Sequence, residues 1–119
     1  MDFKAALERI VHRCEGVKAV ILMDMDGVPI ETVSRDADLD VENLGVEYAR
    51  IVSETRKMSA NLESGAMTEM DIATDRGMVV MRIIGEEYFL AVVMDWSANH
   101  GKGRYLARMA EFQLLPELT

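Results

Sequence analysis

The sequence is poor in cysteine and in positive charge, and it has no long apolar run. The only cysteine, Cys14, excludes an intramolecular disulfide. The first residues lack the basic-then-apolar order of a signal peptide, so we expect a reducing, cytoplasmic setting. The 13 Lys and Arg against 21 Asp and Glu give a net charge of -8, which repels a phosphate backbone and predicts no nucleic-acid partner. Apolar runs fall far short of the roughly 20 residues that cross a bilayer, which predicts no membrane insertion.

What the chain does contain is the composition of an ordinary folded domain. Half of its 119 residues are hydrophobic and 29% are charged, so we expect a single domain over residues 1–119. Apolar residues at helical spacing predict a helix from Phe3 to Cys14 and two later helices. Five apolar or alternating runs predict strands at residues 17–25, 28–34, 67–74, 78–84 and 88–95.

The hydrophobicity of these five runs predicts their order in a sheet. Residues 17–25 and 88–95 are the most apolar, so we expect them side by side at the centre with their hairpin partners outside. Pro29 lacks the amide that a central strand donates, which puts residues 28–34 at an edge. The expected fold class is therefore α+β, with a five-stranded antiparallel sheet of order 2-1-5-4-3. One long helix would cover one face and two helices the other.

The long helix is expected to begin after Asp38 or Asp40 and to close at Gly65. Its larger apolar residues recur at helical spacing and predict the face that packs on the sheet: Val41, Leu44, Tyr48, Ile51, Val52, Thr55, Met58 and Leu62. A second stripe, rich in small residues, is expected on the outward face, where it would let another helix approach. It consists of Glu42, Val46, Ala49, Ser53, Arg56 and Ala60.

The last helix is expected after the loop SANHGKG. Its buried face is predicted from helical spacing and contains Tyr105, Leu106, Met109, Phe112 and Leu115. The helix is expected to end near Pro116. The glycine-rich loop lacks the spacing of a phosphate-binding loop, and its residues read more simply as a helix cap.

The stretch MDMDGVPIE, residues 23–31, has two interpretations. In a haloacid-dehalogenase-like phosphatase, Asp24 would attack phosphorus and Asp26 would protonate the leaving group. In a hairpin, Asp26 and Gly27 would be the two positive-φ residues of a type I′ turn. No later residue supplies the lysine and third carboxylate of the phosphatase, so we favour the turn. No histidine pair has ligand spacing, and we expect no metal and no cofactor. A sensory module that binds a small ligand is a further alternative.

The edge strand at residues 67–74 has no proline to block pairing. Two copies of the chain would join there and lay their long helices together. The residues expected at this homodimer interface are the small-residue stripe given above together with Met67, Thr68, Met70 and Ile72.

The chain resembles the roadblock/dynein light chain family over almost its whole length. VKAVILMDMDGVPIETVS is similar to the first hairpin of the family, and ANHGKGRYLARMAEF is similar to the step into its last helix. The long helix and the three-stranded meander follow in the family's order. The resemblance is to the prokaryotic members, which include gliding-motility GTPase regulators.

The resemblance implies a non-enzymatic homodimer with a continuous sheet and paired long helices. It also implies a small Ras-like GTPase as the partner. The GTPase would meet the paired helices at charged and polar residues beside their contact line. We expect these residues to be Arg50, Glu54, Lys57 and Asn61.

Overall fold

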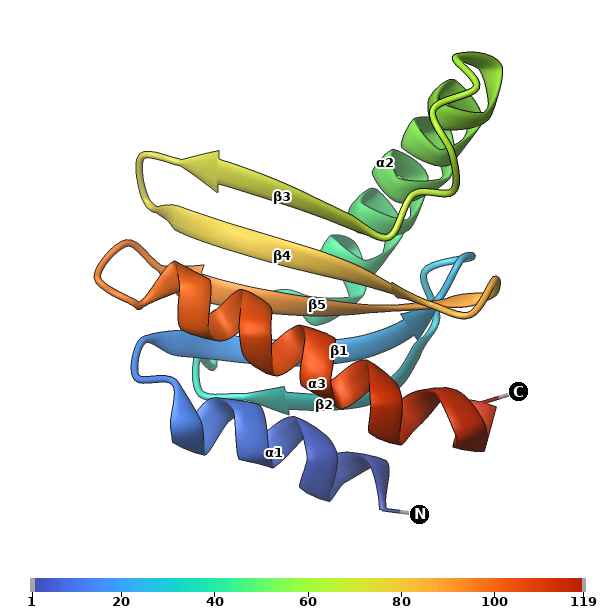
Figure 1. Ribbon diagram of the computed structural model, residues 1–119. Coiled ribbons are helices and arrows are strands. Elements are labelled where there is room, and N and C mark those ends of the chain that lie inside the picture. Colours follow the sequence, from blue (N-terminus) through green and yellow to red (C-terminus); the bar gives the residue numbers. More distant parts are fainter. Residues whose placement is uncertain (1, 119) are drawn as a thin grey trace.

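A five-stranded antiparallel sheet separates two helical layers (Figure 1). The structure is a computed structural model and describes residues 2–118. In chain order the elements are α1 (Phe3–Arg13), β1 (Val17–Asp24), β2 (Pro29–Ser34), α2 (Val41–Asn61), β3 (Glu69–Thr74), β4 (Gly77–Ile84), β5 (Tyr88–Asp95) and α3 (His100–Leu118). The strand order β2-β1-β5-β4-β3 confirms the predicted topology. Within residues 2–118, no helix combines the length and the apolar character needed to span a membrane.

The central strands are apolar throughout because both of their faces are covered. In β1, Val20 and Leu22 belong to the core beneath α1 and α3. The alternate residues Ile21 and Met23 belong to the core beneath α2. Successive side chains of a strand point to opposite faces, so the uninterrupted run of hydrophobic residues serves two cores.

The long helix α2 covers only part of its face of the sheet. It begins behind the central strands of the sheet, passes behind β4, and its C-terminal turns extend past the β3 edge (Figure 1). The Asp40 side chain caps its first turn by accepting from the Asn43 amide at 3.2 Å. The helix ends at Asn61 and not at Gly65, because Glu63 already has a left-handed φ of 55°. The loop that follows α2 continues to Thr68, so β3 begins at Glu69 and not at Met67.

The expected start of the last helix is also wrong, whereas its end at Leu118 lies near Pro116 as predicted. α3 begins at His100, because the Asn99 side chain accepts from the Lys102 amide at 3.1 Å and caps the first turn. Gly103 lies inside the helix, where a Cβ would come within 2.4 Å of the Met94 sulfur. The glycine therefore permits close helix-sheet contact and does not break the helix. Pro116 also lies within α3, in its last turn.

The buried face of α3 differs from the predicted one. Its core residues are mostly small: Gly103, Leu106, Ala107, Ala110 and Leu114. Three of the large residues expected there are exposed, with Tyr105 at 60%, Met109 at 44% and Phe112 at 67%. Small side chains let the helix lie close to the sheet, and the larger ones are left on its outer flank.

Candidate functional site

The side chain of Asp24 closes the hairpin between β1 and β2. Asp24 Oδ1 accepts hydrogen bonds from the amides of Asp26 at 2.9 Å and Val28 at 3.0 Å. The Gly27 amide donates to the Asp24 carbonyl at 3.1 Å, and the Asp24 amide donates to the Val28 carbonyl at 3.1 Å. This carboxylate oxygen therefore organises the turn, in the way that Asp side chains stabilise turns elsewhere.

The predicted type I′ turn is wrong, although the hairpin itself is present. Type I′ needs positive φ at both central residues. Gly27 has φ +85°, but Asp26 is not among the residues with positive φ. The hydrogen bonds instead define a three-residue loop, Met25 to Gly27, with Gly27 as the bulge residue. The phosphatase alternative required a parallel, doubly wound sheet, and the antiparallel sheet overturns that fold.

The hairpin loop packs directly on α2. A Cβ added to Gly27 would lie 2.9 Å from the Gly45 carbonyl oxygen and 2.9 Å from the Val46 Cα. A Cβ on Gly45 would lie 2.8 Å from the Gly27 carbonyl oxygen. The two glycines thus let the loop and the helix touch through their backbones, and this contact sets the position of the N-terminal half of α2.

An acidic cleft of about 540 Å³ lies beside this contact. Its lining consists of Asp24, Met25, Asp26, Ser53, Arg56, Glu86, Glu87 and Tyr88. Arg56 Nη1 donates to the Glu86 carbonyl at 2.8 Å and ties α2 to the β4–β5 turn. Within residues 2–118, no group of three or more His, Cys, Asp or Glu side chains is arranged to hold a metal ion. Among residues 2–118, the core contains no buried polar or charged residue.

The sequence predicted that the small-residue stripe of α2 lies on the outward face of the helix. The structure shows that it does not. Ala49 is only 3% exposed and belongs to the core beneath α2. Ser53 and Arg56 face the acidic cleft of their own chain. Glu42, Val46 and Ala60 are exposed. The stripe therefore lies on the flank of α2 that faces the β1–β2 hairpin, and part of it is already covered.

The apolar stripe expected to face the sheet does so only in part: Val41, Tyr48 and Val52 pack on the core beneath α2 as predicted, whereas its other large residues lie on the opposite flank. Val52 and Ala49 make the contact with the core. Leu44 and Ile51 are half-buried, whereas Met58 and Leu62 are 53% and 66% exposed. These four residues, which we call the α2 apolar stripe, recur at steps of seven and four residues on one side of the helix.

The α2 apolar stripe lies on the side of the helix that faces β3. Tyr48 is on the same side of α2 and shares a 230 Å³ pocket with Ile72 of β3. Met67, Met70 and Ile72 pack against the same core cluster as Tyr48, while Thr68 is exposed. In the part of the chain that the structure describes, β3 pairs with β4 alone, as predicted, so its outer edge is unpaired there. The overhanging end of α2 and the free edge of β3 therefore lie together at one end of the sheet (Figure 1).

The residues expected to meet a partner protein lie on the outer side of α2. Arg50, Glu54, Lys57 and Asn61 are all exposed. Arg50 pairs with Glu47, and Lys57 pairs with Glu54 at 3.6 Å, in each case within the helix. Their side chains are more than two-fifths exposed, so these pairs contribute little to folding and remain accessible to another molecule.

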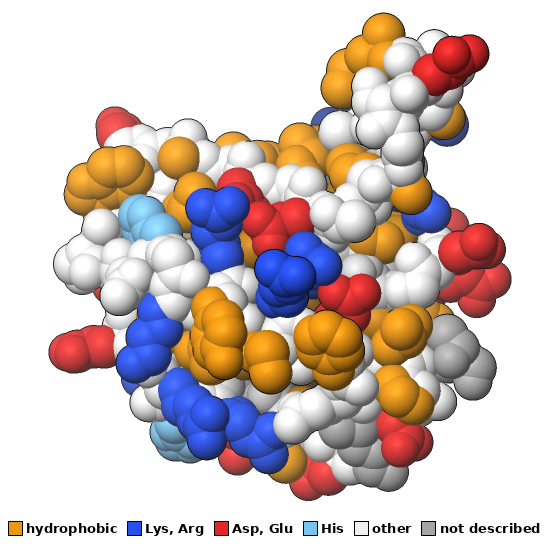
Figure 2. Space-filling model, viewed as in Figure 1, with side chains coloured by type: hydrophobic (Ala, Val, Ile, Leu, Met, Phe, Trp, Pro, Cys, Tyr) orange, Lys and Arg blue, Asp and Glu red, His pale blue; other side chains and the backbone are white. Residues whose placement is uncertain are grey.

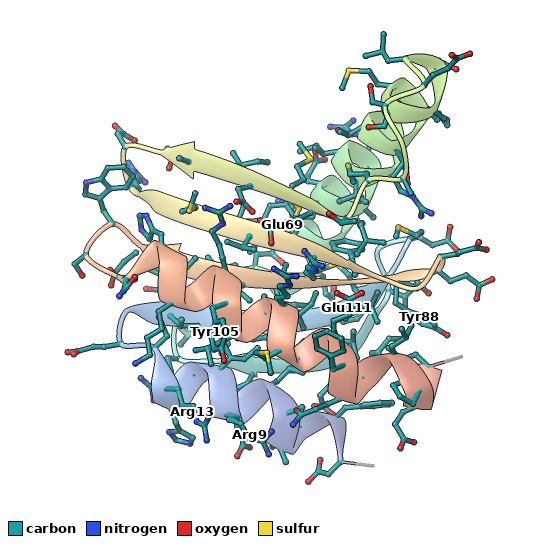
Figure 3. All side chains as sticks on the ribbon, viewed as in Figure 1. Arg9, Arg13, Glu69, Tyr88, Tyr105 and Glu111 are labelled. Carbon is teal, nitrogen blue, oxygen red and sulfur yellow. The ribbon has the colours of Figure 1, made fainter. Side chains whose placement is uncertain are left out.

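A charge cluster between β3 and α3 was not predicted from the sequence. Arg82 Nε donates to Glu111 Oε1 at 2.8 Å, and Arg104 Nε lies 3.1 Å from Asp71 Oδ2. Asp71 Oδ1 is buried without a hydrogen-bond partner. Burial, followed by the charge of Glu69, raises the pKa of Asp71 to about 6. Figure 3 labels Glu69 and Glu111, which enter this cluster from different elements. These residues come together only through tertiary packing, which no local sequence pattern predicts.

Comparison with solved structures places this arrangement among roadblock folds. A Roadblock/LC7 domain from Streptomyces avermitilis is 18% identical with a TM-score of 0.89, covering 99% of this chain and 98% of its own. The gliding protein MglB from Thermus thermophilus is 19% identical with a TM-score of 0.86, covering 94% of this chain and 84% of its own. MglC from Myxococcus xanthus is 32% identical with a TM-score of 0.71, covering 98% of this chain and 99% of its own.

The sequence itself gives the same assignment. The model of the Roadblock/LC7 domain family matches residues 6–94, from α1 to the end of β5. No curated protein matches the chain. The matched segment includes the hairpin, the long helix and the meander on which the resemblance was based. With a family match over most of its length and a relative at 32% identity, the chain belongs to the Roadblock/LC7 domain family.

Proposed function

We propose that this chain is a non-enzymatic homodimeric adaptor that binds a small Ras-like GTPase and modulates its nucleotide cycle or its location. The Roadblock/LC7 family is one of non-enzymatic regulatory domains and includes MglB and MglC. The prokaryotic roadblock proteins that the sequence resembles include regulators of GTPases in gliding motility. Residues 1–119 would act as one domain, in the cytoplasm.

The observation that carries the proposal is the unpartnered end of the molecule. The α2 apolar stripe and the unpaired edge of β3 lie at the same end of the sheet. Exposed strand edges and contiguous apolar surface are features that proteins usually cover. A second copy would cover both at once, because pairing of β3 with β3 continues the sheet beneath the overhanging turns of α2.

This arrangement moves the α2 part of the proposed dimer interface to the other flank of the helix. Leu44, Ile51, Met58 and Leu62 replace the small-residue stripe as the contact with the partner helix. The β3 part, from Met67 to Ile72, stays as proposed from the sequence. Arg50, Glu54, Lys57 and Asn61 would then line the outer surface of the paired helices, beside their contact line.

The paired helices would act by selection among conformations of the GTPase. A partner changes a switch equilibrium only if it binds one conformation more tightly than the other. Exposed charges such as Arg50 and Lys57 set encounter rate and specificity more than stability. No catalytic side chain is required for such a partner to alter nucleotide turnover.

Co-purification tests the proposal. Tagged wild-type protein, incubated with source-cell extract and either GTP or GDP, should retain a Ras-like GTPase in unequal amounts. Arg50→Glu and Lys57→Glu should each lose it, because they reverse charges on the outer surface of α2. Arg35→Glu changes an exposed charge outside α2 and should retain it. Equal retention by all variants, or no GTPase with either nucleotide, would contradict the proposal.

A further inference from the structure

A groove of about 210 Å³ lies between α1 and α3, on the face of the sheet opposite α2. Its floor is formed by buried residues of both helices, including Ile10 and Ala110. Its wall on the α3 side is made by Tyr105, Met109 and Phe112, which are spaced by one helical turn and are largely exposed. Figure 2 shows hydrophobic side chains forming a band across this face.

The side of the groove formed by α1 is basic. Arg9 and Arg13 line it, and Figure 3 shows both on α1, below Tyr105 of α3. The two helices together carry six Lys and Arg against three Glu, whereas the remainder of the chain carries seven Lys and Arg against eighteen Asp and Glu. α1 and α3 are thus the basic helices of an acidic protein. Lys and Arg lie on both sides of the apolar band (Figure 2), and on the β3 side they are accompanied by the acidic residues of the charge cluster.

We propose that the α1–α3 groove binds an acidic amphipathic helix of another protein. An apolar helix face in a groove between two helices is a recurring mode of recognition. The three exposed side chains would contact the apolar face of that helix. Its flanking carboxylates would meet Arg9 and Arg13, for which the basic groove supplies charge complementarity.

The size and shape of the groove favour a helix of another protein over a second copy of this chain and over a lipid surface. Tyr105, Met109 and Phe112 together expose roughly 300 to 400 Å² of surface, based on about 150 to 250 Å² for a large side chain. A stable homodimer buries about 800 Å² on each partner, so a second copy would leave the contact too small. A flat lipid surface does not enter a hollow between two helices, whereas the apolar side chains of a helix that lies along the groove do.

The proposed site is independent of the dimer and of the GTPase surface. Those surfaces use α2 and β3, and the groove lies across the sheet from α2. Both could be occupied at the same time. The protein would then connect a GTPase on one face to an acidic helical segment on the other.

The test uses the full-length protein and fluorescent peptides of about 12 residues, or three helical turns. One peptide has Leu and Phe on one face and Glu on its flanks, and a second has Lys in place of each Glu. The acidic peptide should bind at micromolar concentrations and the basic one at least tenfold more weakly. Tyr105→Ala with Phe112→Ala should weaken acidic-peptide binding at least tenfold. Arg9→Glu with Arg13→Glu should reverse the preference between the two peptides.

Matched controls and a membrane probe complete the experiment. Trp96→Ala removes a large side chain that is 59% exposed outside the groove and should leave peptide binding unchanged. Vesicles of phosphatidylcholine and phosphatidylserine should not bind more tightly than phosphatidylcholine alone. Failure of the acidic peptide to bind, equal binding by the groove variants, or vesicle binding that the same variants abolish would each overturn the proposal.

Discussion

At the scale of single residues, Gly27 carries two separate constraints. Its φ of +85° is a conformation that other residues rarely adopt, and a Cβ there would meet backbone atoms of α2 at 2.9 Å. Gly65 has a similar φ of +91° but no atom within 4 Å of a built Cβ. A comparison of substitutions at Gly27 and Gly65 therefore separates the cost of backbone strain from the cost of close packing.

Gly27→Ala should lower the free energy of unfolding by about 2 to 4 kcal/mol, combining left-handed strain with overpacking. Gly65→Ala should lower it by about 1 kcal/mol, from strain alone. Urea denaturation of the two variants measures both values. Equal losses would show that the contact between the hairpin loop and α2 does not contribute.

Asp71 provides a pH-dependent contribution to stability. Its pKa is raised from 3.8 to about 6 in the folded protein, first by burial and then by the charge of Glu69. Between those pH values the folded form holds a proton that the unfolded form has released, so the free energy of unfolding falls as pH rises from about 4 to about 6. Asp71→Asn removes this loss and should be more stable than wild type by about 1 to 3 kcal/mol at pH 7.

Urea denaturation at several pH values checks this prediction. The advantage of Asp71→Asn should be small at pH 4 and should grow up to about pH 6, following the pKa given for Asp71. Asp75→Asn changes an exposed carboxylate in the next turn and should not reproduce the effect. A difference that is constant with pH, or a variant less stable at pH 7, would contradict the assignment.

At the scale of elements, the strands and the buried face of α1 could be predicted, whereas the faces of α2 and α3 could be predicted only in part. The apolar runs and Pro29 were sufficient for the sheet order, because central strands need two apolar faces and an edge strand tolerates proline. The Asp26–Gly27 signal predicted a hairpin, but two-residue and three-residue loops share it. Helix boundaries shifted where side-chain caps such as Asn99 act.

The faces of α2 and α3 were predicted only in part, and one physical reason accounts for the misassigned residues. Large apolar residues define the most conspicuous periodic stripe. The helices nevertheless pack on the sheet through small buried residues such as Gly45, Ala49, Gly103 and Ala107. Close approach requires small side chains, and the larger ones are left on the flanks. Periodicity alone does not distinguish a core face from a face that binds another protein.

The placement of the α2 apolar stripe predicts which substitutions separate the proposed dimer. Met58→Glu adds a charge to the stripe, and Val46→Glu adds the same charge on the opposite flank. The two side chains have nearly equal exposure, 53% and 55%. Sedimentation equilibrium at micromolar concentration should find dimers for wild type and Val46→Glu and monomers for Met58→Glu. Dissociation of Val46→Glu alone, or a monomeric wild type, would contradict this interface.

At the scale of the whole molecule, the two faces of the sheet differ in charge and in exposed surface. The face with α1 and α3 is basic and has an apolar groove, whereas most of the acidic residues lie elsewhere. The net charge of -8 does not reveal that basic and acidic residues lie on different parts of the surface, because their placement depends on how the chain folds. The sequence therefore predicted an acidic protein without nucleic-acid affinity, but it gave no indication of a second, basic face.

The central claim is that two copies of this chain present one surface to one GTPase. A surface centred on a two-fold axis has space for a single globular protein, so the complex should contain one GTPase for two chains. Isothermal calorimetry with the co-purified GTPase, loaded in turn with GDP and a non-hydrolysable GTP analogue, measures the stoichiometry and both affinities. We predict a ratio of one to two, tighter binding in one nucleotide form, and loss of binding with Arg50→Glu. A ratio of one to one with equal affinity for the two forms would contradict the account.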